Sequence, residues 1–267
     1  MCSPRGASRL TGEHGQAVRT NYQGVVMSHT ISVQPTIAHA GSPPSVPATR
    51  LWRTAGLLAL AHVVLILAGI ALQNSPRLEE GIAGIERGYV EGNMARTMAG
   101  GMVEVLGFVL LIPALVFLAR AIGRRTEIGR WAAQTALMSG MAYVAVTMAV
   151  GFPAGAAALY GAQHGLDVDT AFAINNIRIF SFFLSFALLG LHALGLAVAA
   201  WQDRMMTRWV GWGGLVTGVV LFASVPAAAV GQQDWGVLVW FVWWIGVGVV
   251  LLRHRPHVAP DVRQAVR

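Results

Sequence analysis

The stretch LWRTAGLLALAHVVLILAGIALQ, residues 51–73, decides the fold of this chain. It is as long as the run of about 20 apolar residues that a helix needs to cross a hydrocarbon core about 30 Å thick. Comparable stretches follow at Met98 to Ala119, Trp131 to about Ala154, Asn176 to Ala200, Trp209 to Val230 and Trp235 to Leu252. Backbone polar groups must be satisfied internally in lipid, so each stretch is predicted to be a helix. The predicted fold class is therefore all-α, an integral membrane bundle of six transmembrane helices.

The composition agrees with a chain that folds in lipid. Hydrophobic residues make up 55% and charged residues 12%, and the mean hydropathy is +0.58. A water-soluble domain has a different balance. The net charge of +7 comes from arginines in loops and tails, so nucleic acid is not expected as a partner. The bilayer is the partner that the sequence indicates, and it names no protein partner.

The distribution of arginine predicts the orientation of the helices. One side of the membrane receives Arg50, Arg53, Arg120, Arg124, Arg125, Arg130, Arg204, Arg208, Arg253, Arg255, Arg263 and Arg267. The other side receives Arg77, Arg87, Arg96 and Arg178. Basic loops stay on the cytoplasmic side, so both termini are predicted to be cytoplasmic. The chain contains no lysine, which indicates GC-rich coding and hence a bacterial plasma membrane.

Three regions are predicted along the chain. Residues 1–49 are rich in Ser, Thr, Pro, Gly and His, which favours a disordered cytoplasmic tail. Residues 50–253 form the transmembrane domain, and residues 254–267 form a basic cytoplasmic tail. The apolar run that begins at Leu51 is too long for a signal peptide, so it is predicted to be a retained helix.

The connection from Asn74 to Thr97 has two interpretations. Gly84, Gly88 and Gly92 recur every four residues, and Ile82, Ile85 and Tyr89 fit one helical face, which favours a short helix on the membrane surface. Each glycine costs about 1 kcal/mol relative to alanine in a helix, which favours a flexible acidic loop instead. The sequence leaves both open.

Glu104 is the most informative polar residue, because it lies inside the second apolar stretch. A carboxylate on a lipid face is costly, so it is expected to face the bundle and to pair with a cation. Arg178, at the start of the fourth stretch, is the predicted partner, with Asn175 and Asn176 beside it. This polar group is either a fixed tie between helices or a solute or proton site.

His62 and His192 form a second constellation, since both lie in the inner to middle part of the membrane. Two facing imidazoles are able to hold haem through its axial positions. The alternative is that each histidine is hydrogen-bonded to a neighbouring helix, and no cofactor is then expected. The single cysteine, Cys2, excludes a multi-cysteine metal site. The sequence has no HExxH, GxSxG or P-loop pattern, so the protein is not expected to be an enzyme.

Two further groups of residues lie in the fifth and sixth stretches. Gly214 and Gly218 have the spacing of small residues at helix contacts, and Gly246 and Gly248 lie in the last helix, which indicates packing within the chain. The aromatic cluster of the last helix is predicted to face lipid at the interface. It consists of Trp240, Phe241, Trp243 and Trp244.

The stretch LGLHALGLAVAAWQDRMMTRWVGWGGLVTGVVLF, Leu189 to Phe222, and the segment LLIPALVFLARAI resemble a family of bacterial membrane proteins. These are small six-helix proteins known only as a domain of unknown function. The resemblance covers about residues 51 to 252 and implies a membrane location and no activity. The predicted function is a non-enzymatic accessory, regulatory or stress-related membrane component. The alternatives are a small-solute or proton-coupled transporter using Glu104 and Arg178, and a haem protein or electron carrier using His62 and His192.

Overall fold

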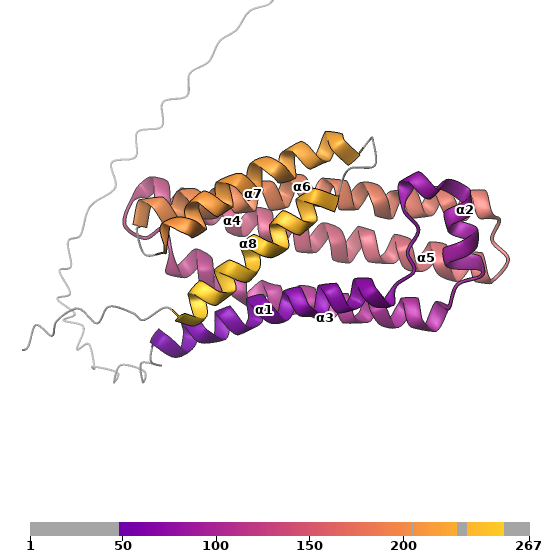
Figure 1. Cartoon of the computed structure of the whole chain (residues 1–267), viewed down its shortest axis with the longest axis horizontal. Coiled ribbons are helices and arrows are strands. Elements are labelled where there is room, and N and C mark those ends of the chain that lie inside the picture. The colour runs from indigo at the N-terminus through magenta and orange to yellow at the C-terminus, as the bar shows by residue number, and fades with distance from the viewer. Residues whose placement is uncertain (1–47, 204–205, 229–233, 254–267) are drawn as a thin grey trace, which may run out of the picture. The chain divides into compact units, whose positions relative to one another are not determined.

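The computed structural model describes residues 48–203, 206–228 and 234–253, and these ranges contain helices and connections but no strand (Figure 1). The helices are α1 (Ala48–Leu72), α2 (Gly81–Ile85), α3 (Met94–Ala121), α4 (Glu127–Val146), α5 (Phe152–Gln163), α6 (Val168–Asp203), α7 (Arg208–Ala227) and α8 (Asp234–Arg253). The predicted tails, residues 1–49 and 254–267, lie outside the described residues except for the first two residues of α1.

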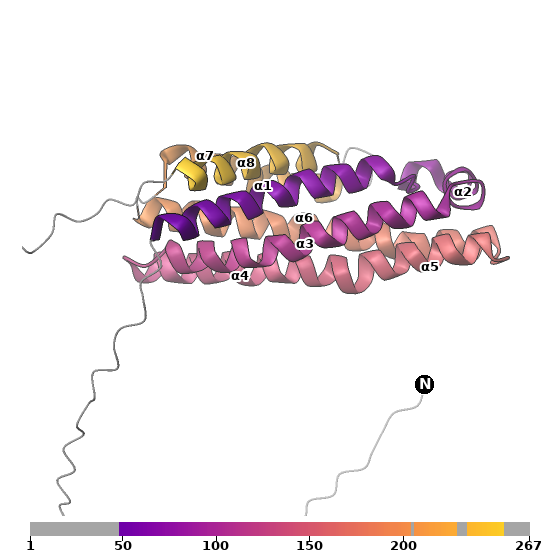
Figure 2. The same ribbon diagram turned by 90° about the horizontal axis from the view of Figure 1, so that it is seen from below.

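The prediction of an all-α bundle with six membrane spans is confirmed. Six stretches of helix are long and apolar enough to cross a membrane: Thr49–Leu72, Met94–Ala121, Glu127–Gln163, Val168–Gln202, Arg208–Ala227 and Trp235–Arg253. The first span begins and the last span ends at the same end of the bundle, which we call the terminal end (Figures 1 and 2). The opposite end carries α2 and is called the α2 end.

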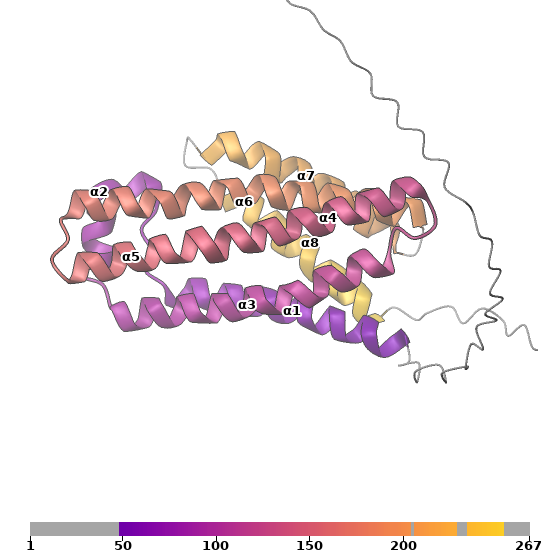
Figure 3. The ribbon, with the colours of Figure 1, turned by 180° about the vertical axis from the view of Figure 1, so that it is seen from behind.

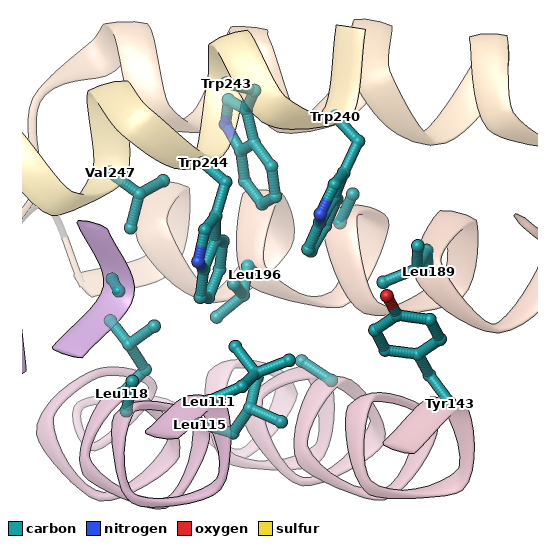
Figure 4. Close-up of a cluster of buried hydrophobic side chains, with 14 of the residues drawn as sticks. Leu111, Leu115, Leu118, Tyr143, Leu189, Leu196, Trp240, Trp243, Trp244 and Val247 are labelled. Atoms are coloured by element: carbon teal, nitrogen blue, oxygen red, sulfur yellow. The ribbon is translucent and has the colours of Figure 1, made fainter. Parts of the chain in front are cut away.

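The spans are arranged as a closed ring. Helix α1 packs against α3 and α8, α3 also packs against α4, α4 against α6, α6 against α7, and α7 against α8. Large buried side chains from α3, α6 and α8 fill the space inside the ring (Figure 4). The middle of the bundle is therefore a packed apolar core.

The third span is one continuous rod made of α4, a π-helical turn at Thr147–Gly151 and α5 (Figure 3). Pro153 causes the turn, because proline lacks the backbone N–H and its ring clashes with the carbonyl of the residue four positions earlier. That residue, Ala149, lies inside the π turn, where the wider winding relieves the clash. The span of 37 residues is longer than the predicted stretch that ended near Ala154.

The spans formed by α4–α5 and by α6 exceed the length that a bilayer requires. At 1.5 Å per residue, the 35 residues of Val168–Gln202 extend about 50 Å, against about 30 Å for the hydrocarbon core. Their excess length at the α2 end supports a second small core made of Ile85, Tyr89, Ala158, Leu159, Ala162 and Ala171. This end therefore has its own packed structure.

The connection between α1 and α3 is helical, which decides between the two interpretations of its sequence. It contains a 3-10 turn at Leu78–Glu80, α2 and a π-helical turn at Glu86–Val90. Ile85 and Tyr89 are buried, whereas Ile82 is 44% exposed, so the predicted face is only partly correct. The glycines allow close contacts: a Cβ at position 88 would lie 2.6 Å from the Asn74 carbonyl oxygen.

The prediction that the aromatic cluster of α8 faces lipid is wrong. Trp240, Phe241, Trp243 and Trp244 are buried, with at most 8% of each residue exposed. Trp240 and Trp244 stack with ring centroids 5.1 Å apart, and Trp243 donates Nε1–H to the Val210 carbonyl at 3.1 Å. Helix faces toward lipid and toward the core are both apolar in a membrane, so hydropathy does not distinguish them.

Glycines bring the helix backbones together at several crossings. A Cβ at Gly56 would lie 2.8 Å from the Gly248 carbonyl oxygen, and one at Gly100 would lie 2.7 Å from the Gly69 carbonyl oxygen. In α7, Gly214 and Gly218 meet α6 in the same way, which agrees with the predicted packing within the chain. The α1–α8 and α1–α3 crossings thus depend on the absence of side chains.

We predict that Gly56→Ala destabilises the bundle by about 1–3 kcal/mol, because the added methyl group overlaps the backbone of α8. Gly101→Ala is the matched control: its Cβ meets nothing within 4 Å, so it is expected to be neutral or to stabilise by up to about 1 kcal/mol. The measurement is the free energy of unfolding in detergent, followed by tryptophan fluorescence. Equal free energies of unfolding for the two variants would contradict the close contact between α1 and α8 at Gly56.

Candidate functional site

The predicted intramembrane polar residues lie toward the α2 end of the bundle. Asn175, Asn176 and Arg178 are on α6, and Glu104 is on α3. The structure joins Asn175 and Arg178 directly and adds residues from the connection between α1 and α3. We call the resulting group of Gln73, Ser75, Pro76, Tyr89, Glu104, Asn175 and Arg178 the polar cluster.

Asn175 is the centre of this cluster. It is fully buried, and its Oδ1 accepts hydrogen bonds from the Tyr89 hydroxyl at 3.0 Å and from Arg178 Nε at 2.8 Å. Arg178 also donates from Nη2 to the Pro76 carbonyl at 2.6 Å. Its side chain crosses α5 at Gly155, where a Cβ would lie 2.7 Å from Arg178 Cδ. These bonds fasten α6 to the connection that follows α1.

Tyr89 and Gln163 hold the π-helical turn in place. Gln163, the last residue of α5, donates from Nε2 to the carbonyls of Tyr89 at 2.7 Å and Gly92 at 2.8 Å. Burial raises the pKa of the Tyr89 hydroxyl above its usual value, and the nearby charge of Arg178 opposes part of that increase. Tyr89 therefore stays a neutral donor to Asn175 at ordinary pH.

The predicted direct contact between Glu104 and Arg178 is not formed. The structure describes both residues and contains no hydrogen bond or ion pair between them. The reason is that the guanidinium group of Arg178 is directed to Asn175 and Pro76 instead. The two charges remain within electrostatic range of each other.

Glu104 lies at the crossing of α3 with α1. A Cβ on Gly69 would overlap its side chain, so glycine at that position makes room for the carboxyl group. The side chain of Gln73, just after α1, lies next to Glu104. Its Nε2 is buried and is not in hydrogen-bonding geometry with any described acceptor. Tyr143 of α4 is also within electrostatic range of Glu104.

A polar groove of about 310 Å³ opens above this crossing. It is lined by Leu72, Gln73, Asn74, Asn93, Arg96 and Thr97. Gln73 therefore belongs both to the groove and to the surroundings of Glu104. Within the described residues, Asn175 Nδ2 and Asn176 Oδ1 are likewise buried without a partner. Buried unpaired groups of this kind are positions that water or a small polar ligand satisfies.

The hydroxyl groups of neighbouring helices make local bonds. Ser181 donates to the Arg178 carbonyl at 2.6 Å, Ser185 to the Ser181 carbonyl at 2.9 Å, and Thr147 to the Tyr143 carbonyl at 2.9 Å. Hydroxyls in membrane helices commonly bond to the preceding turn in this way. Thr147 Oγ1 and Ser185 Oγ also lie 3.4 Å apart across two neighbouring helices.

The two histidines are buried and tied to different helices. His62 Nδ1 is 2.9 Å from the Gly107 carbonyl of α3, and His192 Nδ1 is 2.7 Å from the Ala136 carbonyl of α4. Both Nε2 atoms are buried without a described partner. A histidine that ligates a metal usually has its other nitrogen bonded in the same manner.

Aromatic rings surround both histidines. Phe108 packs edge-on against His62 with ring centroids 5.8 Å apart, and Trp240 and Trp244 pack against His192 at 5.7 and 5.6 Å. Aromatic side chains therefore pack directly against both imidazoles. The structure is consistent with the alternative from the sequence, in which each histidine is hydrogen-bonded to a neighbouring helix.

Sequence reasoning missed Tyr89, Gln163, Gln73 and Pro76 as members or supports of the site. The sequence indicates Tyr89 only through its helical periodicity and Gln73 only as the end of an apolar stretch. A useful signal was present, because Gln163 and Gln73 are amides at the ends of spans. Such side chains satisfy backbone groups that helix ends leave open.

We predict that Tyr89→Phe lowers the free energy of unfolding by about 1 kcal/mol, because it removes the hydrogen bond to Asn175 and leaves the packing intact. Tyr160→Phe is the matched control, since Tyr160 is 55% exposed on α5. Denaturant unfolding in detergent provides the comparison. If both variants lose the same stability, Tyr89 does not hold the α2 end through its hydroxyl.

The chain has no match among protein-family models, curated proteins or solved structures. Its class therefore rests on its own helices, six of which are suited to cross a membrane. The protein is a multi-pass membrane protein with a polar cluster confined to the α2 end.

Proposed function

We propose that this protein is a non-enzymatic accessory or regulatory component of a bacterial plasma membrane. The observation that carries the proposal is the apolar core between the two ends of the bundle (Figure 4). Leu111, Leu115, Leu196, Trp240 and Trp244 meet there, each at most 2% exposed. The packed side chains separate the polar cluster from the terminal end, which supports a scaffold role over a solute path.

The proposed location follows from the arginines and from the resemblance of residues 51 to 252 to a bacterial family of unknown function. Arginines flank the spans at the terminal end more densely than at the α2 end. The positive-inside rule then places the terminal end, with both chain termini, in the cytoplasm. The polar cluster faces the outside.

Cysteine labelling tests this orientation. In a Cys2→Ser background, we expect Glu91→Cys, near the α2 end, to react with a membrane-impermeant maleimide in intact cells. Arg130→Cys, at the start of α4, is expected to react only after permeabilisation. Both positions are exposed, so access alone does not separate them. The opposite pattern would invert the proposed topology.

Glu104 and Arg178 support a second candidate function, small-solute or proton-coupled transport. The carboxyl group has no ion-pair partner among the described residues, and Gln73 connects its surroundings to the polar groove. A carboxyl group inside a membrane span is expensive to keep and is therefore commonly functional.

Proton flux into proteoliposomes distinguishes the two candidates. For a scaffold, we expect the dissipation of an imposed pH gradient to equal that of protein-free liposomes. For an exchange site that crosses the core, flux above this level would be lost in Glu104→Gln and retained in Glu86→Gln, an exposed acid at the same end. That second pattern would replace the accessory role by proton-coupled transport.

A further inference from the structure

A second groove lies at the terminal end, between α6 and α7. It has a volume of about 370 Å³ and is lined by Trp201, Arg208 and Trp212. Trp201 lies just before the end of α6, and Arg208 is the first residue of α7. Trp212 follows one helical turn later, about 6 Å farther along the axis. The groove therefore runs from the end of a span into the membrane.

The two indoles that line the groove contact each other, and one of them packs on the backbone of α7. Trp201 lies flat against α7 at Gly211, where a Cβ would overlap its Nε1. Its ring meets that of Trp212 edge-on, with centroids 5.3 Å apart. Trp212 remains 60% exposed and Trp201 37% exposed. The result is a wide aromatic surface next to an exposed guanidinium group.

We propose that this groove binds an anionic phospholipid. The guanidinium of Arg208 binds the headgroup phosphate, and the indoles contact the glycerol and the first part of an acyl chain. Arginine matches a phosphate group with a pair of parallel hydrogen bonds. Indole rings prefer the headgroup level of a membrane, where one edge is polar and the faces are apolar. Among the side chains that the structure describes, one arginine and two indoles line the groove and no acid does.

The charge of the terminal end favours the same occupant. Exposed arginines surround this end at the start of α1, between α3 and α4, and at the end of α8: Arg50, Arg53, Arg120, Arg124, Arg125, Arg130 and Arg253. Clusters of arginine at a membrane surface attract anionic lipids by about 1 kcal/mol per residue. Arg208 lines the groove, is exposed, and makes no hydrogen bond or ion pair with another residue whose side chain the structure describes. A zwitterionic lipid carries no net charge to match this field.

Native mass spectrometry of the full chain, released from micelles with phosphatidylglycerol or phosphatidylcholine, tests the proposal. We expect phosphatidylglycerol to bind more tightly, and Arg208→Gln to weaken that binding about tenfold, as the loss of a charged hydrogen bond predicts. Arg253→Gln is the matched control, because it removes one positive charge from the same end outside the groove. Trp212→Leu is expected to weaken the binding of both lipids.

Three results would overturn the proposal. Equal binding of the two lipids would exclude recognition of the anionic headgroup. Equal losses in Arg208→Gln and Arg253→Gln would show that the charge of the whole end, and not this groove, attracts the lipid. Unchanged binding in Trp212→Leu would show that the indoles do not contact it. Thermal unfolding of each variant without added lipid confirms that the chain is folded.

Discussion

The rest of the structure depends on the close approach of helix backbones at glycine. Water does not drive helices together inside a membrane, so association relies on van der Waals contact, which requires short distances between backbones. Gly56 faces Gly248 across the α1–α8 crossing, and Gly69 faces Gly100 across the α1–α3 crossing. These crossings connect α1 to both of its neighbours and close the ring. A ring closed in this way leaves room at its centre for the large side chains of α8.

Glycines at helix crossings also make room for charged side chains. At the α1–α3 crossing, the missing side chain of Gly69 admits Glu104, and at α5 the missing side chain of Gly155 admits Arg178. Both charged residues thus occupy space that glycines provide near one end of the bundle. The middle holds histidines whose Nδ1 atoms are bonded to backbone carbonyls. The charged side chains that enter the bundle, Glu104 and Arg178, therefore both lie toward the α2 end.

The sequence predicts the number and type of the helices well. It does not predict which face of each helix packs inside the bundle. A span is recognised by length and hydropathy alone, so the six helices followed directly from the apolar stretches. Partner choice depends on how each helix is rotated, and a lipid-facing side is as apolar as a buried one. Trp244, fully buried, and Trp235, 65% exposed, therefore look alike in the sequence. The predicted contact between Glu104 and Arg178 is not formed for a related reason. Complementary charge identifies a possible partner, but the sequence does not show that Arg178 donates its hydrogen bonds to Asn175 and to a backbone carbonyl instead.

Helix α6 relates the two ends of the molecule. It carries Asn175 and Arg178 near its start and Trp201 near its end, and it packs against α4, α5 and α7 along the way. The space between the ends is filled by close-packed side chains, which transmit displacement but admit no solute. Any movement transmitted from Arg178 to Trp201 would run along α6, because this helix carries both residues. The π-helical turn at Thr147–Gly151 packs on α6. At this turn the third span departs from regular α-helical winding, so α6 has an irregular neighbour there.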